Sequence, residues 1–337
     1  MVRLNSRLSI VAMSIAATGM MLSSCGATHA AKPPKVARKN ITITLASFPA
    51  IAPIALMQAS NVLEKEGYTV KWITILSGLP TEAEAMASGS LDFAWGNTAA
   101  ALAIFAAAPN VGWLVGESVT NENITVVRNG SGITKLSQLA GQKVVISGLK
   151  TASTLFYELA LAKAGISSTS DTFVTSNGPA MSGVLASGAV NVAAAYTPFS
   201  SEMVLDHIGT VLVTANQAFG GTAPGDGFIV SQAFAKAHPN AVVAVLKAAQ
   251  AADDLILSDP KVEYPVLAKF AAVPENVISY SISKGYIGIR RSLVPSVSAY
   301  DKIAADEQAH GFAPSGVNLV SFANSFVKPS FAKKAVG

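Results

Sequence analysis

The sequence predicts an α/β protein built from two similar lobes. Its 337 residues exceed the length of a typical single domain. Segments rich in β-branched residues alternate with helical stretches, which favours parallel sheets with helices between the strands. A strand–loop–helix pattern that starts at residue 41 returns about 100 residues later, at residue 143. This internal repeat indicates two lobes of one build.

The first copy of the repeat covers residues 41–98. Its expected strands are residues 41–45, 69–76 and 91–95. The helix after the first strand is expected to end at Gly67. The helix after the second strand is expected to begin at Thr81, because Thr81 and Glu84 have the spacing of a capping box. An Ala-rich helix completes the copy.

The second copy covers residues 143–199. Its expected strands are residues 143–147, 172–175 and 190–195, with a helix at 153–164 and a shorter one before residue 188. Residues 87–94 align with residues 186–193, and Ser77-Gly78 lies 100 positions before Asn177-Gly178. Chance similarity, with the glycines serving only as helix caps, is the alternative. Three matched units at nearly one offset favour a true repeat.

The repeat also places a candidate site. In open α/β sheets, ligands bind beyond the carboxyl ends of the strands. Six loops follow the expected strands: residues 47–50, 77–81 and 95–98 in the first copy, and 148–154, 176–179 and 196–199 in the second. If the two lobes face each other, all six loops meet at one cleft.

Residues 1–24 are typical of an export signal. Arg3 and Arg7 precede an apolar stretch of about 15 residues, which is short for a membrane span. The stretch ends in Leu-Ser-Ser-Cys-Gly, which resembles a bacterial lipobox and implies cleavage before Cys25 and a thioether-linked lipid on it. An uncleaved membrane anchor, or ordinary cleavage after Ala27 that discards the cysteine, are the alternatives.

Charge and cysteine content exclude several functions. Residues 25–39 have the composition of a flexible tether. The net charge is +4, but six of the 24 basic residues precede position 40, which leaves 18 against 20 acidic residues and a body of about −2. A body without a basic stripe does not favour nucleic-acid binding. With Cys25 as the only cysteine, neither a disulfide nor a Cys-based metal site is expected.

Five short segments stand in a characteristic order: residues 77–80 (SGLP), 88–93 (SGSLDF), 136–144 (LSQLAGQKV), 187–190 (SGAV) and 234–239 (FAKAHP). With this order and spacing, the chain resembles the solute-binding proteins of ABC importers for aliphatic sulfonates, taurine, nitrate and thiamine-pyrimidine precursors. The resemblance implies a two-lobed, type II periplasmic-binding-protein-like fold, a monomer without a cofactor, and ABC permease and ATPase partners.

The resemblance also implies two crossover segments between the lobes, for which residues 124–127 and 228–231 are the candidates. Residues 40–125 and 228–337 would then form the first lobe, and residues 126–227 the second. The protein would be exported and lipid-anchored to the bacterial membrane, on its periplasmic or extracellular face.

Candidate ligand-binding residues lie on the six loops and at the return crossover. They are Phe48, Ser77, Gly78, Trp95, Asn97, Thr98, Lys150, Thr151, Ser153, Thr154, Tyr196, Phe199 and Asp226. The hydroxyls of Ser153 and Thr154 stand at an expected helix start, which favours an anion, although ordinary N-capping needs the same residues. The aromatic residues could equally fill the core. Asp226 is either a partner for a ligand amine or a turn residue.

No arginine lies on these loops, which favours a singly charged or neutral headgroup over phosphate. We expect a small organic anion or heterocycle, with an aliphatic sulfonate as the first choice. A thiamine-pyrimidine precursor, nitrate or taurine is the alternative ligand, and a ligand-sensing lipoprotein without a permease is the alternative role. An enzyme of pyrimidine metabolism is disfavoured, because the four histidines are scattered and neither metal-ligand spacing nor a nucleophile-elbow motif occurs.

Overall fold

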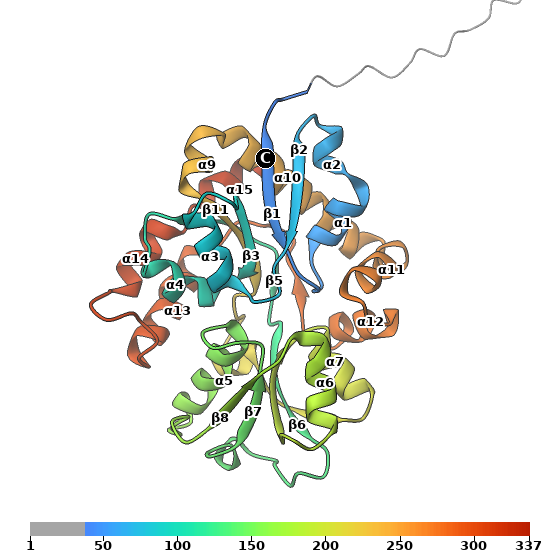
Figure 1. Ribbon diagram of the computed structural model, residues 1–337, viewed down its shortest axis with the longest axis vertical. Helices are drawn as coiled ribbons and strands as arrows, with labels where there is room; N and C mark the ends of the chain where they lie inside the picture. Colours follow the sequence, from blue (N-terminus) through green and yellow to red (C-terminus); the bar gives the residue numbers. More distant parts are fainter. Residues whose placement is uncertain (1–37) are drawn as a thin grey trace, which may run out of the picture. The chain divides into compact units, whose positions relative to one another are not determined.

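The computed structural model describes residues 38–337. The expected leader, Cys25 and all but the last two residues of the expected tether lie outside this range. Within it the chain forms two α/β lobes, each built on a five-stranded sheet (Figure 1). No helix of the described residues is both long and apolar enough to cross a membrane.

The first lobe is built on a sheet of order β2-β1-β3-β11-β4. Its strands are β1 (Thr42–Ser47), β2 (Thr69–Thr74), β3 (Phe93–Asn97), β4 (Gly112–Glu117) and β11 (Asp226–Ser231). Strand β1 pairs in parallel with β2 and β3, whereas β11 runs antiparallel to β3 and β4. All five residues of β3 and all six of β11 are buried, because helices cover both faces of the sheet.

The second lobe repeats this plan with the order β10-β6-β9-β7-β8. Its strands are β6 (Asn123–Arg128), β7 (Lys143–Ile146), β8 (Thr172–Thr175), β9 (Val192–Tyr196) and β10 (Gly209–Thr214). Strand β7 pairs in parallel with β8 and β9, and β6 runs antiparallel to β9 and β10. Each lobe therefore has three parallel strands and an antiparallel return, which is the repeat that the sequence predicts.

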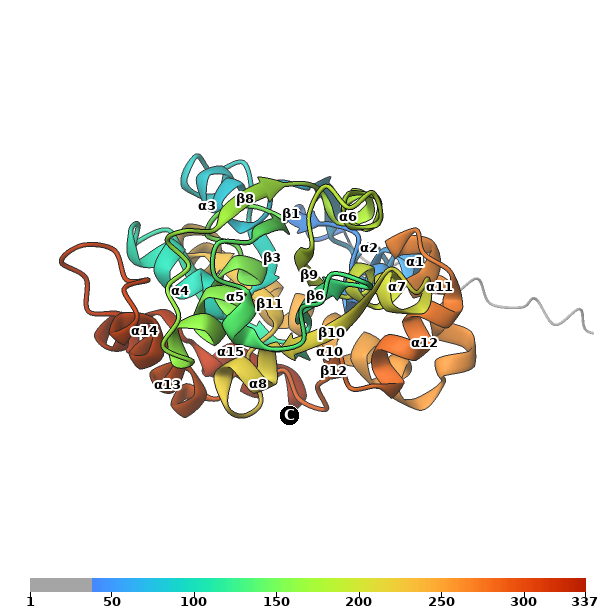
Figure 2. The ribbon, with the colours of Figure 1, turned by 90° about the horizontal axis from the view of Figure 1, so that it is seen from below.

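Helices follow the strands in corresponding order. The first lobe has α1 (Pro53–Ser60), α2 (Val62–Lys65), α3 (Leu79–Ala87) and α4 (Thr98–Ala106). The second has the 3-10 turn η1 (Leu136–Gln138), α5 (Ala152–Lys163), α6 (Gly178–Ala186), α7 (Phe199–Leu205) and α8 (Ala215–Phe219). Helix α5 lies on one side of the second sheet and α6 and α7 lie on the other (Figure 2).

The C-terminal third of the chain is helical and packs on the first lobe. It comprises α9 (Gln232–Ala237), α10 (Pro239–Ser258), α11 (Pro260–Ala271), α12 (Glu275–Ser283), α13 (Val297–Ala309), α14 (Leu319–Phe326) and α15 (Pro329–Val336). Helix α10 packs against α1 and α15, α14 packs against α4, and α15 contacts β4. Two short strands remain, β5 (Val119–Thr120) and β12 (Gly288–Ile289), and they pair with each other in antiparallel fashion.

The crossovers lie beside the positions expected for them. Residues 124–127 fall inside β6 and residues 228–231 fall inside β11, so both segments are strands flanked by neighbours on both sides. Both segments are buried and apolar. Hydrogen bonding to a neighbouring strand on each side stabilises them more than bridging the two lobes would. The polar stretch 118–122 and the stretch 215–225 make the actual passages.

Two helix boundaries also differ from expectation. Helix α3 begins at Leu79 rather than at Thr81, because Gly78 precedes it with a φ of +83°, a conformation that glycine adopts without strain. The Thr81 hydroxyl accepts a hydrogen bond from Ser77 at 2.9 Å instead of capping a helix. The single helix expected before Gly67 is divided at Asn61, whose φ is +50°.

Candidate ligand-binding site

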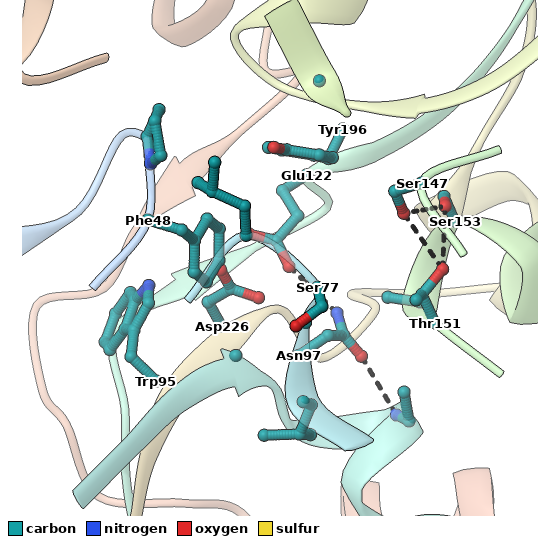
Figure 3. A pocket seen from close by; sticks show the side chains of 18 of the residues that line it. Phe48, Ser77, Trp95, Asn97, Glu122, Ser147, Thr151, Ser153, Tyr196 and Asp226 are labelled. Atoms are coloured by element: carbon teal, nitrogen blue, oxygen red, sulfur yellow. Dashed lines mark hydrogen bonds between the residues drawn. The ribbon is translucent and has the colours of Figure 1, made fainter. Parts of the chain in front are cut away.

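A cavity of about 260 Å³ lies where loops of both lobes meet (Figure 3). It is bounded by residues that follow β1, β2 and β3 in the first lobe and β7, β8 and β9 in the second. The first-lobe lining is Phe48, Pro49, Ile75, Leu76, Ser77, Gly78, Leu79, Trp95, Gly96, Asn97 and Ala100. The second-lobe and crossover lining is Glu122, Asn123, Ser147, Thr151, Ala152, Ser153, Asn177, Gly178, Pro179, Tyr196 and Asp226.

Aromatic side chains form one wall of the cavity. The rings of Phe48 and Tyr196, which come from different lobes, meet edge to face with centroids 6.0 Å apart. Trp95 packs against Phe228 with centroids 4.7 Å apart and is 1% exposed. Its indole N–H has no hydrogen-bond acceptor within the described part of the chain. This wall offers apolar ring faces together with one unused donor.

Two carboxyl groups form the acidic part of the lining, and each is only 5% exposed. Glu122 lies in the outgoing crossover and Asp226 opens β11. The Glu122 Oε1 atom accepts hydrogen bonds from the side-chain amides of Asn97 at 2.9 Å and Asn123 at 3.5 Å. Asn97 is held in turn by helix α4, since its Oδ1 accepts from the amides of the first turn. The helix start thereby fixes the amide that binds the carboxyl.

Burial raises the pKa of both carboxyl groups. It raises the pKa of Asp226 to about 6. Burial also raises the pKa of Glu122 well above its ordinary range, and the neighbouring Asp226 charge raises it further. Two adjacent buried carboxylates repel each other, so the pair titrates as a unit.

A cluster of hydroxyl groups lies opposite the carboxyl pair, at the start of α5 (Figure 3). Ser147 bonds to Thr151 at 3.0 Å and to Ser153 at 2.8 Å, and Thr151 bonds to Ser153 at 3.1 Å. Thr151 is the N-cap residue of α5 but makes no side-chain cap bond. The start of this 12-residue helix therefore presents hydroxyls and the positive end of the helix dipole to the cavity.

A further carboxyl lies behind the aromatic wall. Glu82 on α3 is fully buried, and its Oε2 accepts a hydrogen bond of 2.9 Å from the backbone N–H of Trp95. Burial raises the pKa of Glu82 to about 8, against this hydrogen bond. Its second oxygen has no partner among residues 38–337. Glu82 thus supports Trp95 from behind and does not line the cavity.

The profile of the NMT1-like family matches residues 35–270, which is more than half of the chain. The chain belongs to the NMT1-like family. The match covers both sheets of the structure and every residue that lines the cavity.

Relatives of this NMT1-like chain include binding proteins of known name. The Taurine-binding periplasmic protein of Escherichia coli (strain K12) is 28% identical over 246 residues, covering 70% of this chain and 74% of that protein. The alkanesulfonate-binding protein SsuA from Xanthomonas axonopodis pv. citri, solved bound to MOPS, has a TM-score of 0.73 at 19% identity, covering 85% of this chain and 98% of the other. The periplasmic nitrate-binding protein NrtA from Synechocystis PCC 6803 has a TM-score of 0.72 at 14% identity, covering 89% of each.

These likenesses confirm both the family resemblance and the two-lobed periplasmic-binding-protein-like fold expected from the sequence. The solved structures are less than 25% identical to this chain in sequence, so their similarity shows only the fold.

The structure places nine of the thirteen predicted ligand-binding residues in the cavity lining of this NMT1-like protein. These nine are Phe48, Ser77, Gly78, Trp95, Asn97, Thr151, Ser153, Tyr196 and Asp226. Eight of them lie at or just beyond the carboxyl ends of parallel strands, where the rule for open α/β sheets expects a ligand. Asp226 is instead the first residue of the antiparallel strand β11.

The other four predicted residues lie outside the lining. The Thr98 hydroxyl donates to Gly225 O at 2.8 Å within the core. Lys150 is exposed, with a φ of +59° in the loop before α5. The Thr154 hydroxyl turns back to Gly148 O at 2.7 Å. Phe199 is 1% exposed and packs against Tyr196 with centroids 5.3 Å apart, so it supports the wall from behind.

Several lining residues were not predicted, and Glu122 is the most consequential. It belongs to the polar run Thr120-Asn121-Glu122-Asn123 between two buried strands. A polar run at a crossover between apolar strands is the signal that could have identified it. For Ser147 the sequence pattern predicts only the end of a strand, and for Asn177 only a turn. Among residues 38–337, no group of three or more His, Cys, Asp or Glu is arranged to hold a metal ion.

Proposed function

We propose that this chain is the solute-binding component of an ABC importer. It captures a small molecule in the cavity between its lobes and delivers it to a membrane permease driven by an ATPase. The cavity carries this proposal, because both lobes contribute its walls at the carboxyl ends of their parallel strands. The relatives named for binding taurine and alkanesulfonates support it.

Capture follows from the position of the cavity. A ligand that contacts Phe48 from one lobe and Tyr196 from the other stabilises the arrangement in which the lobes are close. Such a ligand shifts the population toward the closed state by its differential affinity for that state. The permease then recognises the closed, loaded form.

We assign binding rather than catalysis to the polar lining. The hydroxyls of Ser147, Thr151 and Ser153 bond to one another, and Thr151 also donates to Gly148 O at 2.8 Å. None of these three is paired with a general base in the way that nucleophilic catalysis needs. A closed ring of hydroxyls suits a ligand headgroup that accepts hydrogen bonds.

For the ligand, we propose a small organic molecule with an apolar or ring part against the aromatic wall. Its headgroup would lie at the hydroxyl cluster and the start of α5, where a sulfonate oxygen can accept hydrogen bonds. No Lys, Arg or His belongs to the lining described here, which argues against phosphate. An aliphatic sulfonate is the first candidate of this kind, with taurine and pyrimidine precursors beside it, whereas nitrate has no apolar part.

A blocking substitution tests capture. Ser77 is exposed and lines the cavity, so Ser77→Trp is expected to fill the entrance without disturbing the core. Native mass spectrometry of the gently purified protein is expected to show a retained small molecule in the parent and not in Ser77→Trp. Ser88→Trp, an exposed position at the far end of α3, is the control and should retain the ligand. Equal retention in all three proteins would place binding elsewhere.

Ligand titration gives a second readout of the same cavity. Trp95 lies in the aromatic wall, whereas Trp72 and Trp113 are half-buried elsewhere. Ligand is expected to change the intrinsic fluorescence, and Trp95→Phe should remove most of that change. A signal that persists in Trp95→Phe at unchanged amplitude would contradict the assignment.

We also propose export and lipid anchoring. Residues 1–24 would direct export, Cys25 would carry the lipid, and residues 25–39 would tether the body to the membrane. A single acyl chain anchors weakly, and two or more anchor stably. Cys25→Ser is expected to abolish incorporation of labelled fatty acid and to move the protein out of the membrane fraction, with Ser24→Ala as the control. Membrane retention and normal processing of Cys25→Ser would refute the anchor.

A further inference from the structure

The charges around the cavity are one-sided. Its two ionisable acids, Glu122 and Asp226, face a lining without a basic side chain among the described residues. A third acid, Glu117, lies close enough to raise the pKa of Glu122, but its own partner is Arg290 at 3.3 Å. The Arg290 guanidinium is thereby paired with Glu117. The cavity lining itself contributes no basic side chain to balance its two acids.

The carboxyl pair is also short of hydrogen-bond donors. Glu122 receives two side-chain amides, from Asn97 and Asn123. The Asp226 carboxyl lies close enough for its charge to raise the pKa of Glu122, so the two acids are neighbours in the lining. A buried carboxylate without donors is destabilised by its desolvation, so a donor or a positive charge in the ligand stabilises the ionised pair.

The aromatic wall has a hydrogen-bond donor without an acceptor. The indole N–H of Trp95 is buried beside the cavity with no acceptor in residues 38–337. A ligand that fits this lining therefore supplies donors or positive charge at the carboxyls and has an acceptor to offer near the indole. The rings of Phe48 and Tyr196 belong to the same lining, and aromatic faces attract organic cations.

We propose that Glu122 and Asp226 form the recognition site for a cationic amino group, so that the solute is an amine, an amidine or a protonated amino-heterocycle. The inference rests on the proposed capture function and names the ligand class for the same cavity. A sulfonate fits this lining when it also carries an ammonium group, with the sulfonate at the α5 hydroxyls and the ammonium at the carboxyls.

The proposal makes binding depend on pH in a defined direction. The ligand cation favours the ionised carboxyls, so affinity rises with pH through the pKa of the free pair. The other ionisable groups near the pair are Tyr196, Glu82 and Glu117, and none of them reverses this pH dependence. Burial and the pair itself raise the pKa of Tyr196, which stays a phenol, and burial raises the pKa of Glu82 and Glu117. Affinity falls again when the ligand amine loses its own proton.

Matched ligand pairs test the class by calorimetry at about pH 7, where an alkylammonium group keeps its proton. The pairs are taurine with 2-hydroxyethanesulfonate, and 4-amino-2-methylpyrimidine with 2-methylpyrimidine. In at least one pair, the amino compound is expected to bind about 10-fold or more tightly than its partner, as a charge-assisted hydrogen bond predicts. Its affinity should fall as the pH is lowered toward about 5.

Isosteric variants test the residues. Asp226→Asn and Glu122→Gln keep the shapes of the side chains and remove one charge each, and both are expected to abolish most of the amino preference and its pH dependence. Asp206→Asn removes an exposed carboxylate in the second lobe and should leave both intact. Circular dichroism identifies any variant that fails to fold, in which case the other carboxamide variant decides.

The outcomes are distinguishable from failure of the capture function. Equal binding within both pairs, no binding of either amino compound, or an amino preference unchanged in both carboxamide variants overturns the inference. If a neutral or anionic compound still binds and Ser77→Trp blocks it, capture stands and the amine class fails. If Ser77→Trp blocks no retained ligand and no probe, the proposed function itself fails.

Discussion

At the scale of single residues, neighbours in the chain have divided roles. Asn97 and Thr98 follow each other at the junction of β3 and α4, yet one lines the cavity and the other is part of the core. Thr98 donates to Gly225 O at 2.8 Å, and Tyr300 donates to the Thr98 hydroxyl at 2.6 Å. The threonine thereby ties the strand end to the return crossover and to α13. Asn97 points the other way and holds Glu122.

Thr98→Val is expected to destabilise the protein without weakening ligand binding. Valine has the shape of threonine but leaves the Tyr300 hydroxyl without its acceptor, while the Gly225 carbonyl keeps only the bond from the backbone N–H of residue 98. Unsatisfied buried polar groups cost about 1–3 kcal/mol each. Urea denaturation measures the stability, and calorimetry the affinity. A loss of affinity with unchanged stability would place Thr98 in the binding site after all.

At the scale of elements, α6 illustrates how a helix positions the wall of the cavity. Its first residue, Gly178, lies against the ring of Phe199 and the hydroxyl of Tyr196, so closely that any side chain there would collide with both. Gly183 lies on the same helix and has open space where a side chain would begin. The glycine at the start of α6 is therefore required for packing, whereas the one in its middle is not.

Gly178→Ala is expected to displace Tyr196 and so to lower both stability and ligand affinity. The overpacking should destabilise the protein by about 1–3 kcal/mol. Gly183→Ala is the matched control, expected to stabilise by about 0.5–1 kcal/mol because alanine favours the helix. Thermal unfolding and ligand titration of the two variants give the comparison. Equal behaviour of the two would show that Tyr196 does not depend on this contact.

At the scale of the whole molecule, buried carboxyls set the pH dependence of stability. Burial raises the pKa of Glu82 to about 8 and that of Asp226 to about 6. It also raises the pKa of Glu117, Glu122, Asp253 and Glu307. Each folded-state pKa lies above its unfolded value, so the folded state holds more protons in the interval between them. Stability is therefore full below the unfolded pKa and is lost as pH rises through the folded one.

The melting temperature of the free protein is expected to fall as pH rises from about 5 to about 8. Each pKa unit crossed by one group corresponds to about 1.4 kcal/mol. Glu82→Gln should flatten the upper part of this curve, because Glu82 has the highest of the two pKa values given. Glu84→Gln, an exposed change on the same helix, should leave the curve unchanged. A melting temperature that is constant or rises over this range contradicts the expectation.

Much of the architecture could be predicted from local pattern. The β-branched runs at residues 41, 69 and 143 are strands, and the loops that follow them meet at the cavity. Local pattern was insufficient at helix starts. The capping-box spacing predicts a start at Thr81, but the helix begins at Leu79, directly after Gly78 and with Pro80 in its first turn. Local pattern also failed for Phe199, because an aromatic residue at a strand end can face the cavity or lie behind its wall, and only packing decides between them.

The α/β class, the duplicated lobe and the family are predictable from the amino-acid order, because they depend on hydrophobic periodicity and motif order, which are local properties. The chemistry of the cavity follows only from the folded chain. Glu122 and Asp226 are 104 positions apart, and they meet because the two connections between the lobes run side by side, with Thr120 bridging Pro224. Burial then raises the pKa of both carboxyls. Neither that proximity nor the dielectric around it is encoded in any short stretch of chain.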